Sequence, residues 1–80
     1  EDKINIWEIQ SNLNNLIKKG LAKKSAKGYE IDLRGYVVLG EGEVKDKLII
    51  RSKKASKSAI EKIKKSGGDI IIEKQGNIKQ

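Results

Sequence analysis

The chain has neither cysteine nor histidine among its 80 residues. Without cysteine, no disulfide and no thiolate metal site can stabilise a domain this small. Without histidine, the commonest metal ligand and the commonest general base are both missing. No apolar run approaches the roughly 18 residues of a membrane span, and no secretory signal is recognisable. We therefore expect a soluble, intracellular protein with no metal site, no cofactor and no membrane partner.

The side chains that remain for catalysis are those of Asp, Glu, Lys, Ser and Tyr. Glu30 and Asp32 lie two residues apart, as do Glu41 and Glu43, so either pair could share one face of a strand. Carboxylates at this spacing are typical of solvated strands, and the lone Gly-x-Gly at residues 40–42 is typical of a plain turn. A chain this small can hardly bury a pocket for a small-molecule substrate. The residues therefore predict a protein that is not an enzyme.

Positive charge is concentrated in one stretch of the chain. Lys45–Lys65 contains nine Lys or Arg residues and two acidic residues, whereas the rest of the chain has nine of each. This stretch therefore carries the whole net charge of +7. Such a segment indicates a polyanionic partner, and nucleic acid is the best candidate.

The 80 residues are expected to form one globular domain, residues 1–80, that begins with a helix. Asn5 and Glu8 have the spacing of a capping box, and Gly20 is a stop signal, which predicts a helix from Ile6 to Lys19. A later start near Ser11, with residues 4–7 extended, is also compatible with the sequence. The predicted apolar face recurs every three or four residues and consists of Ile6, Ile9, Leu13, Leu16 and Ile17.

Three short strands are predicted after residues 21–27, which show no periodicity. Tyr29–Leu33 alternates apolar and polar residues, and Tyr36–Leu39 is an apolar run that ends at the glycine turn. Leu48–Ile50 is the next apolar run, so a strand–turn–strand unit is expected around the glycines.

The carboxy-terminal part predicts a second helix and a last strand. Residues 56–66 have one apolar face, an N-cap at Ser56 or Ser58 and a stop at Gly67-Gly68. Ile70–Ile72 predicts a strand that is buried on both faces of the sheet, and the tail beyond Glu73 is expected to be frayed. The predicted fold is an α/β domain with a small mixed sheet and two helices.

The basic stretch supplies the candidate binding residues. Its strand and its helix are predicted to form one contiguous cationic ridge, and the helix start adds free amides and hydroxyls that suit phosphate oxygens. The candidates for phosphate contact are Lys45, Lys47, Arg51, Lys53, Lys54, Ser56, Lys57, Ser58, Lys64 and Lys65.

The aromatic residues lie outside this ridge. Trp7, Tyr29 and Tyr36 are expected to pack in the core or at its edge, so stacking on single-stranded bases is not favoured. Folded or double-helical nucleic acid, bound through its backbone, fits better. The alternative is an interaction module that binds an acidic protein through the same ridge, although the ridge lacks the aromatic and Met anchors of protein hot spots.

Three segments resemble the carboxy-terminal domain of the L-fifteen family of large-subunit ribosomal proteins. They are Tyr36-Val-Val-Leu-Gly-Glu-Gly-Glu-Val44, Leu48-Ile-Ile-Arg-Ser-Lys-Lys-Ala-Ser-Lys-Ser-Ala-Ile-Glu-Lys-Ile63 and Gly67-Gly68-Asp-Ile-Ile-Ile72. The match extends more weakly to residues 3–35, and its style is archaeal or eukaryotic. The sister L-eighteen-e family shares the glycine pattern.

This resemblance implies irregular β-β-α turns and a structural role in the cytoplasmic ribosome, without catalysis. It implies ribosomal RNA of the large subunit and neighbouring ribosomal proteins as partners. By the same resemblance, Gly40, Gly42, Gly67 and Gly68 shape the turns while the lysines around them contact RNA. The family's long amino-terminal arm is absent here, so the chain is expected to be a carboxy-terminal portion.

Overall fold

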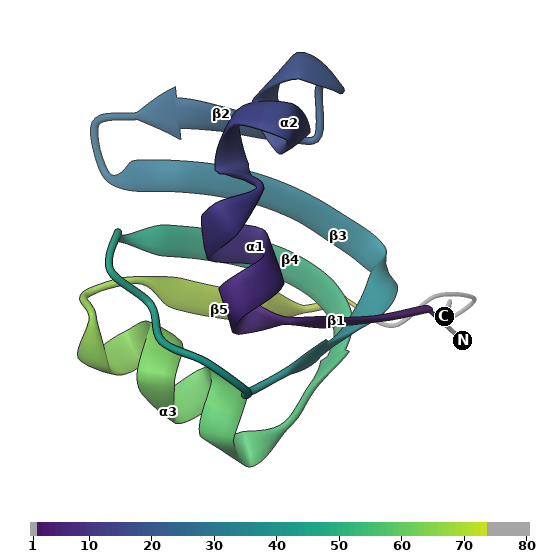
Figure 1. The fold of residues 1–80 in the computed structure, drawn as a ribbon. Helices are drawn as coiled ribbons and strands as arrows, with labels where there is room; N and C mark the ends of the chain where they lie inside the picture. The colour runs from purple at the N-terminus through teal and green to yellow at the C-terminus, as the bar shows by residue number, and fades with distance from the viewer. Residues whose placement is uncertain (1, 74–80) are drawn as a thin grey trace, which may run out of the picture.

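Five strands form one sheet, and three helices cover one of its faces (Figure 1). The computed structural model describes residues 2–73, so the frayed tail predicted beyond Glu73 lies outside the described residues. The elements are β1 (Asp2–Asn5), α1 (Ile6–Ser11), α2 (Leu13–Lys18), β2 (Ala22–Ser25), β3 (Gly28–Leu39), β4 (Leu48–Ala55), α3 (Lys57–Lys65) and β5 (Asp69–Ile72). The mixed α/β class predicted from the sequence is confirmed.

The strands β1, β3, β4 and β5 lie side by side in that order and are all parallel. β2 pairs antiparallel with the first half of β3, and β1 pairs with its second half. Because β3 and β4 are parallel, they do not form the compact strand–turn–strand unit expected from the sequence. Residues 40–47 instead return along the sheet to the start of β4, between α1 and α3 in Figure 1.

The core lies between the helices and the covered face of the sheet. Alternate strand residues point into it, as the period of two in a strand requires. Its least exposed large side chains are those of Ile6, Ile9, Leu33, Val38, Leu48, Ile50 and Ile63. The opposite face carries no helix, so we call it the open face of the sheet.

The prediction that β5 is buried on both faces was wrong. Ile70 is buried, but the side chains of Ile71 and Ile72 are 38% and 41% exposed. β5 is the last strand of the sheet, and Ile71 pairs with the exposed Arg51 on the open face. A run of three isoleucines does not reveal that its strand lies at an edge.

The predicted first helix starts where expected but is not continuous. It begins at Ile6, and Oε1 of Glu8 accepts a hydrogen bond from the Asn5 N–H at 2.8 Å. Asn12 interrupts it, because both its backbone N–H and its side-chain amide donate to the carbonyl of Glu8, at 3.1 and 2.8 Å. The interruption separates α1 from α2, and Ile17 is consequently 39% exposed instead of part of the core.

Two features of the strands were not predicted. Residues 22–25 form β2, although Ala22 is the only buried residue in that segment and two lysines follow it. The runs Tyr29–Leu33 and Tyr36–Leu39 belong to one strand, β3, with an irregularity between Leu33 and Val37 where the pairing with β4 shifts. Gly35 lies within this irregularity.

The last helix follows its sequence signals closely. Ser56 is the N-cap, since its Oγ accepts a hydrogen bond from the Ala59 N–H at 3.2 Å, which decides between the two serines. Ala59 and Ile63 are fully buried. The N–H groups of Gly67 and Gly68 donate to the carbonyls of the last turn, at 3.0 Å each, and thereby end the helix.

The glycine turn at residues 40–42 fits tightly between α1 and α3. A Cβ on Gly40 would meet Oγ of Ser58 and would lie 2.6 Å from the Ala59 nitrogen. The ammonium of Lys62 donates to the carbonyls of Gly40 and Gly42, at 2.8 Å each. The Trp7 N–H donates to the Glu41 carbonyl at 3.2 Å, while the Trp7 side chain is 49% exposed, contrary to its predicted core position.

Replacing Gly40 with Ala is expected to destabilise the fold by about 1–3 kcal/mol, because the new methyl group meets α3 backbone that cannot move freely. The matched control is Gly35→Ala, since a Cβ at Gly35 has no heavy atom within 4 Å. The control should change stability by less than about 0.5 kcal/mol. Urea unfolding of both variants measures this difference, and equal midpoints would show that Gly40 is not needed for close packing.

Candidate nucleic-acid interface

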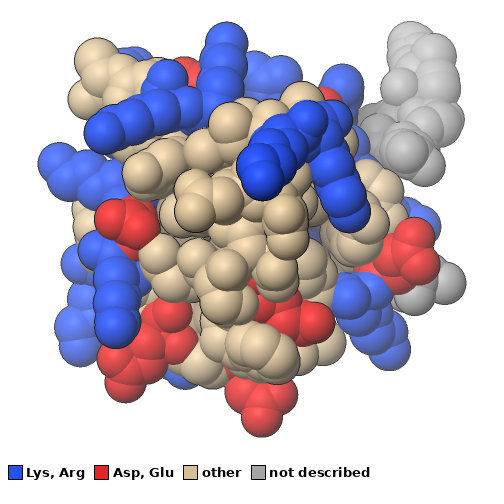
Figure 2. Space-filling model, turned by 45° about the horizontal axis from the view of Figure 1, so that its top comes forward, with Lys and Arg blue, Asp and Glu red and all other residues tan. Residues whose placement is uncertain are grey.

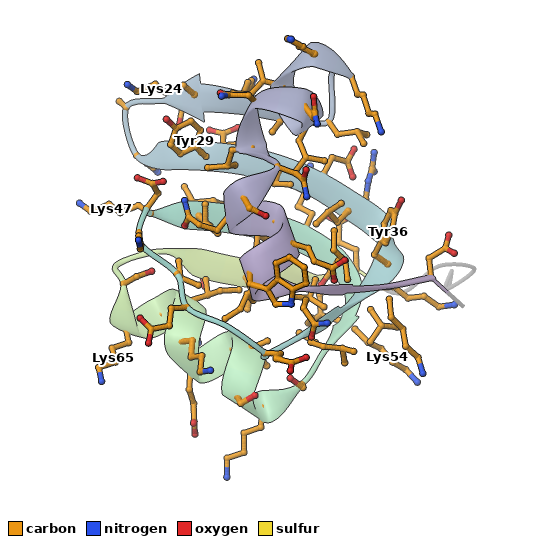
Figure 3. The ribbon with its side chains drawn as sticks, viewed as in Figure 1. Lys24, Tyr29, Tyr36, Lys47, Lys54 and Lys65 are labelled. Atoms are coloured by element: carbon orange, nitrogen blue, oxygen red, sulfur yellow. The ribbon has the colours of Figure 1, made fainter. Side chains whose placement is uncertain are left out.

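The structure divides the predicted cationic ridge into three groups. α3 joins two parallel strands, β4 and β5, and therefore runs back alongside β4. Lys45, Lys47, Lys64 and Lys65 lie near the end of the domain where β4 begins and α3 ends, whereas Lys54 and Lys57 lie near the opposite end. Figure 3 shows Lys47 and Lys65 on one edge and Lys54 on the other side. The ridge predicted from the sequence is therefore not contiguous.

Arg51 and Lys53 form the third group. They alternate along β4 with the buried Ser52, so they belong to the open face of the sheet. Arg51 Nε lies 3.9 Å from a carboxylate oxygen of Glu73, and Arg34 lies 3.8 Å from the same carboxylate. The guanidinium of Arg51 therefore already has an anionic neighbour within the domain.

The open face neutralises most of its own charge. Besides the pairs with Glu73, Asp32 binds Arg34, and Lys23 lies 3.9 Å from Glu30. The two carboxylates whose spacing is typical of a solvated strand, Glu30 and Asp32, thus serve as partners for cations. The centre of this face is a shallow depression that also contains the apolar side chains of Ile49 and Ile71.

The pair between Asp32 and Arg34 has the geometry of a two-point contact. Nε and Nη2 of Arg34 donate to the two carboxylate oxygens of Asp32, at 3.0 Å each. These side-chain hydrogen bonds lower the pKa of Asp32 below its ordinary value of 3.8, and the positive charge of Arg51 acts in the same direction. The contact holds the bulged part of β3 in place on the open face.

The lysines at the two ends of the domain differ from the open face in having no ionic partner. Within residues 2–73, no ammonium group among these lysines forms a hydrogen bond or an ion pair. The lysines are Lys45, Lys47, Lys54, Lys57, Lys64 and Lys65. Their charges remain available for an anionic partner, whereas Lys62 is engaged with the glycine turn.

The two serines of the predicted site have contacts inside the domain. Ser56 caps α3, and Ser58 lies against Gly40. The glycine turn therefore covers part of the helix start that the sequence predicts as a phosphate site. Of the four glycines in the prediction, Gly40 and Gly42 form this turn, while Gly67 and Gly68 end the helix.

Two other kinds of site do not occur in the described part of the chain. No helix between residues 2 and 73 has the length and apolar character needed to cross a membrane. Over the same residues, no group of three or more acidic side chains is placed to hold a metal ion.

Figure 2 shows Lys and Arg along much of the upper and left rim of one side, around a centre of mostly uncharged residues. The fold and this surface define a small α/β domain with cationic edges. Residues 3–71 match the family of the ribosomal proteins 50S-L15 and 50S-L18e and their 60S counterpart, and the chain belongs to this family. The resemblance found in the sequence is thereby confirmed.

Several relatives are named "Large ribosomal subunit protein uL15". Those of the archaea Thermofilum pendens and Archaeoglobus fulgidus are each 34% identical over 74 residues, which is 89% of this chain. The relative from Pelagibacter ubique is 39% identical over 69 residues, or 86% of this chain. The matches cover 49%, 41% and 44% of these relatives, so the chain spans less than half of their length.

Asp32→Asn is expected to lower stability at neutral pH, because Arg34 loses its charged acceptor. The folded-state pKa of Asp32 is lowered, so its contribution is fully present above the unfolded value near 3.8 and is lost as pH falls through the folded value. The difference in urea midpoint between wild type and variant should therefore shrink from about pH 7 to about pH 2. A difference that stays constant across this range would contradict the assigned cause.

Proposed function

We propose that this chain is a structural, non-catalytic domain of the large ribosomal subunit that binds ribosomal RNA through its unpaired lysines. Its partners would be large-subunit ribosomal RNA and neighbouring ribosomal proteins, and its location would be the cytoplasmic ribosome. The family and the relatives named as large-subunit proteins support the ribosomal role. The distribution of unpaired charge supports RNA as the direct partner.

One observation carries the choice of surface. The open face pairs its arginines with Asp32 and Glu73, while the lysines at the ends of the domain have no partner within residues 2–73. An exposed ammonium that already neutralises a carboxylate gains less from a phosphate than an unpaired one, since the first interaction must be given up. The unpaired lysines are therefore the first candidates for phosphate contact, with Arg51 in a lesser role.

An RNA backbone fits this surface better than an acidic protein does. Protein hot spots are rich in Trp, Tyr and Arg that are buried in the complex. The exposed large apolar side chains of the described residues are Trp7, Ile17, Ile71 and Ile72, which lie on α1, α2 and β5. None of them belongs to the basic stretch that holds the proposed lysines. Lysines alone suit a partner whose charge repeats along a backbone.

The test is binding to in vitro transcribed large-subunit ribosomal RNA across a salt series. The triple variant Lys47→Gln, Lys64→Gln, Lys65→Gln should flatten the dependence of log K on log salt by up to about 3, because each phosphate interaction contributes about 0.9 to the slope. Glutamine is chosen because acidic residues at the carboxy-terminal end of α3 would disturb the helix. Urea unfolding of each protein verifies that it is folded.

The control is Lys18→Gln, Lys19→Gln, Lys23→Gln, which removes the same charge outside the proposed surface and should leave most of the slope unchanged. Equal effects of the two triple variants would refute the choice of surface. Absence of salt-dependent binding by the wild-type protein would refute the function itself. Polyglutamate that displaces the protein as well as unlabelled RNA does would favour a module for acidic proteins instead.

A further inference from the structure

The β2–β3 hairpin places a lysine and a tyrosine side by side at the same end of the domain as Lys47. Lys24 pairs directly with Tyr29 in the antiparallel register, so their side chains share one face of the sheet. Ala22 and Ile31, two residues from this pair on their respective strands, are buried on the covered face, which identifies the face. Neither Lys24 nor Tyr29 lies in the basic stretch of the sequence.

Backbone contacts hold Tyr29 against the start of β4. Tyr29 pairs with Leu48 in the parallel register, and its N–H donates to the Lys47 carbonyl at 2.8 Å. Its side chain is partly buried and packs on the core. Tyr29 is therefore fixed between Lys24 on one neighbouring strand and the segment that carries Lys47 on the other.

The same edge continues from Lys47 to the end of α3. A Cβ on Gly67 would lie 3.3 to 3.7 Å from Cε, Cγ and Cδ of Lys47, so the stem of Lys47 runs past the turn that ends α3. Lys65 is the last residue of that helix. Figure 3 shows Lys24, Lys47 and Lys65 along one edge of the domain, with Tyr29 set slightly inward between the first two. We call these four residues the hairpin edge.

We propose that Lys24 and Tyr29 bind the RNA backbone together with Lys47 and Lys65, an inference that rests on the proposed function. The ammonium of Lys24 contacts a phosphate, and the Tyr29 hydroxyl hydrogen-bonds a neighbouring phosphate or ribose oxygen. Three separate elements, the hairpin, the β4 start and the α3 end, thereby contact one stretch of RNA. This extends the interface beyond Lys45–Lys65.

The pairing of charges supports Lys24 over its neighbour in the sequence. Within residues 2–73, the ammonium of Lys24 and the hydroxyl of Tyr29 form no hydrogen bond, and Lys24 has no ion pair. Lys23 points to the open face and lies 3.9 Å from Glu30. The one nearby acid in the β4 approach, Asp46, accepts a hydrogen bond from the side-chain amide of Gln10 at 2.6 Å, which orients it toward α1.

Lys23 and Lys24 provide a matched pair for the test, because each substitution removes one charge from the same exposed strand. With in vitro transcribed large-subunit ribosomal RNA as the probe, Lys24→Gln should reduce the salt slope by about 1. Lys23→Gln should leave the slope within the error of the wild-type value. Equal slopes for the two variants would overturn the assignment of Lys24.

Tyr29→Phe tests the hydroxyl without removing the packed ring. It should weaken binding about 2- to 10-fold at every salt concentration, with an unchanged slope, because a neutral hydrogen bond is removed. Unchanged affinity would remove Tyr29 from the interface. Wild-type protein that binds with a normal salt slope while both hairpin variants behave like wild type would refute the hairpin edge but keep the proposed function; wild-type protein that does not bind would refute both.

Discussion

The arrangement of the whole surface depends on how closely the chain approaches the backbone at the start of β4. On one side, the Tyr29 N–H donates to the Lys47 carbonyl at 2.8 Å. On the other, Gly68 lies so close to Leu48 that a Cβ would meet the Leu48 carbonyl oxygen and would lie 2.8 Å from its nitrogen. These two contacts bring the first residue pair of β3 and the end of α3 to the same place. Side chains from three distant parts of the sequence are thereby held along one edge.

Local signals in the sequence were sufficient for the elements that end in strong caps. Ser56 and the Gly67-Gly68 pair define α3 to within a residue, and Asn5 with Glu8 defines the start of α1. Signals failed where tertiary pairing decides the structure. Ala22 is the one buried residue of β2, so its strand has no readable period, and the edge position of β5 leaves Ile71 exposed despite its apolar sequence.

The candidate site was predicted in composition but not in shape. The concentration of lysine in Lys45–Lys65 is evident from the sequence, whereas its division among two ends and a sheet face follows from the parallel crossover of α3. The sequence also could not show that Lys62 hydrogen-bonds the glycine turn or that Arg51 lies beside Glu73. Pairing between residues distant in the chain separates structural cations from those available to a partner. Lys24 became a candidate for the same reason.

The most direct measurement is a titration of ¹⁵N-labelled protein with ribosomal RNA, followed by the chemical shifts of its backbone amides. If unpaired lysines at the hairpin edge bind the RNA, the largest changes will occur at Lys24, Tyr29, Lys47 and Lys65. Glu30 and Arg51 on the open face, whose charges already have partners in the domain, will change little. The opposite pattern, with changes centred on the open face and none at the hairpin edge, would contradict this account.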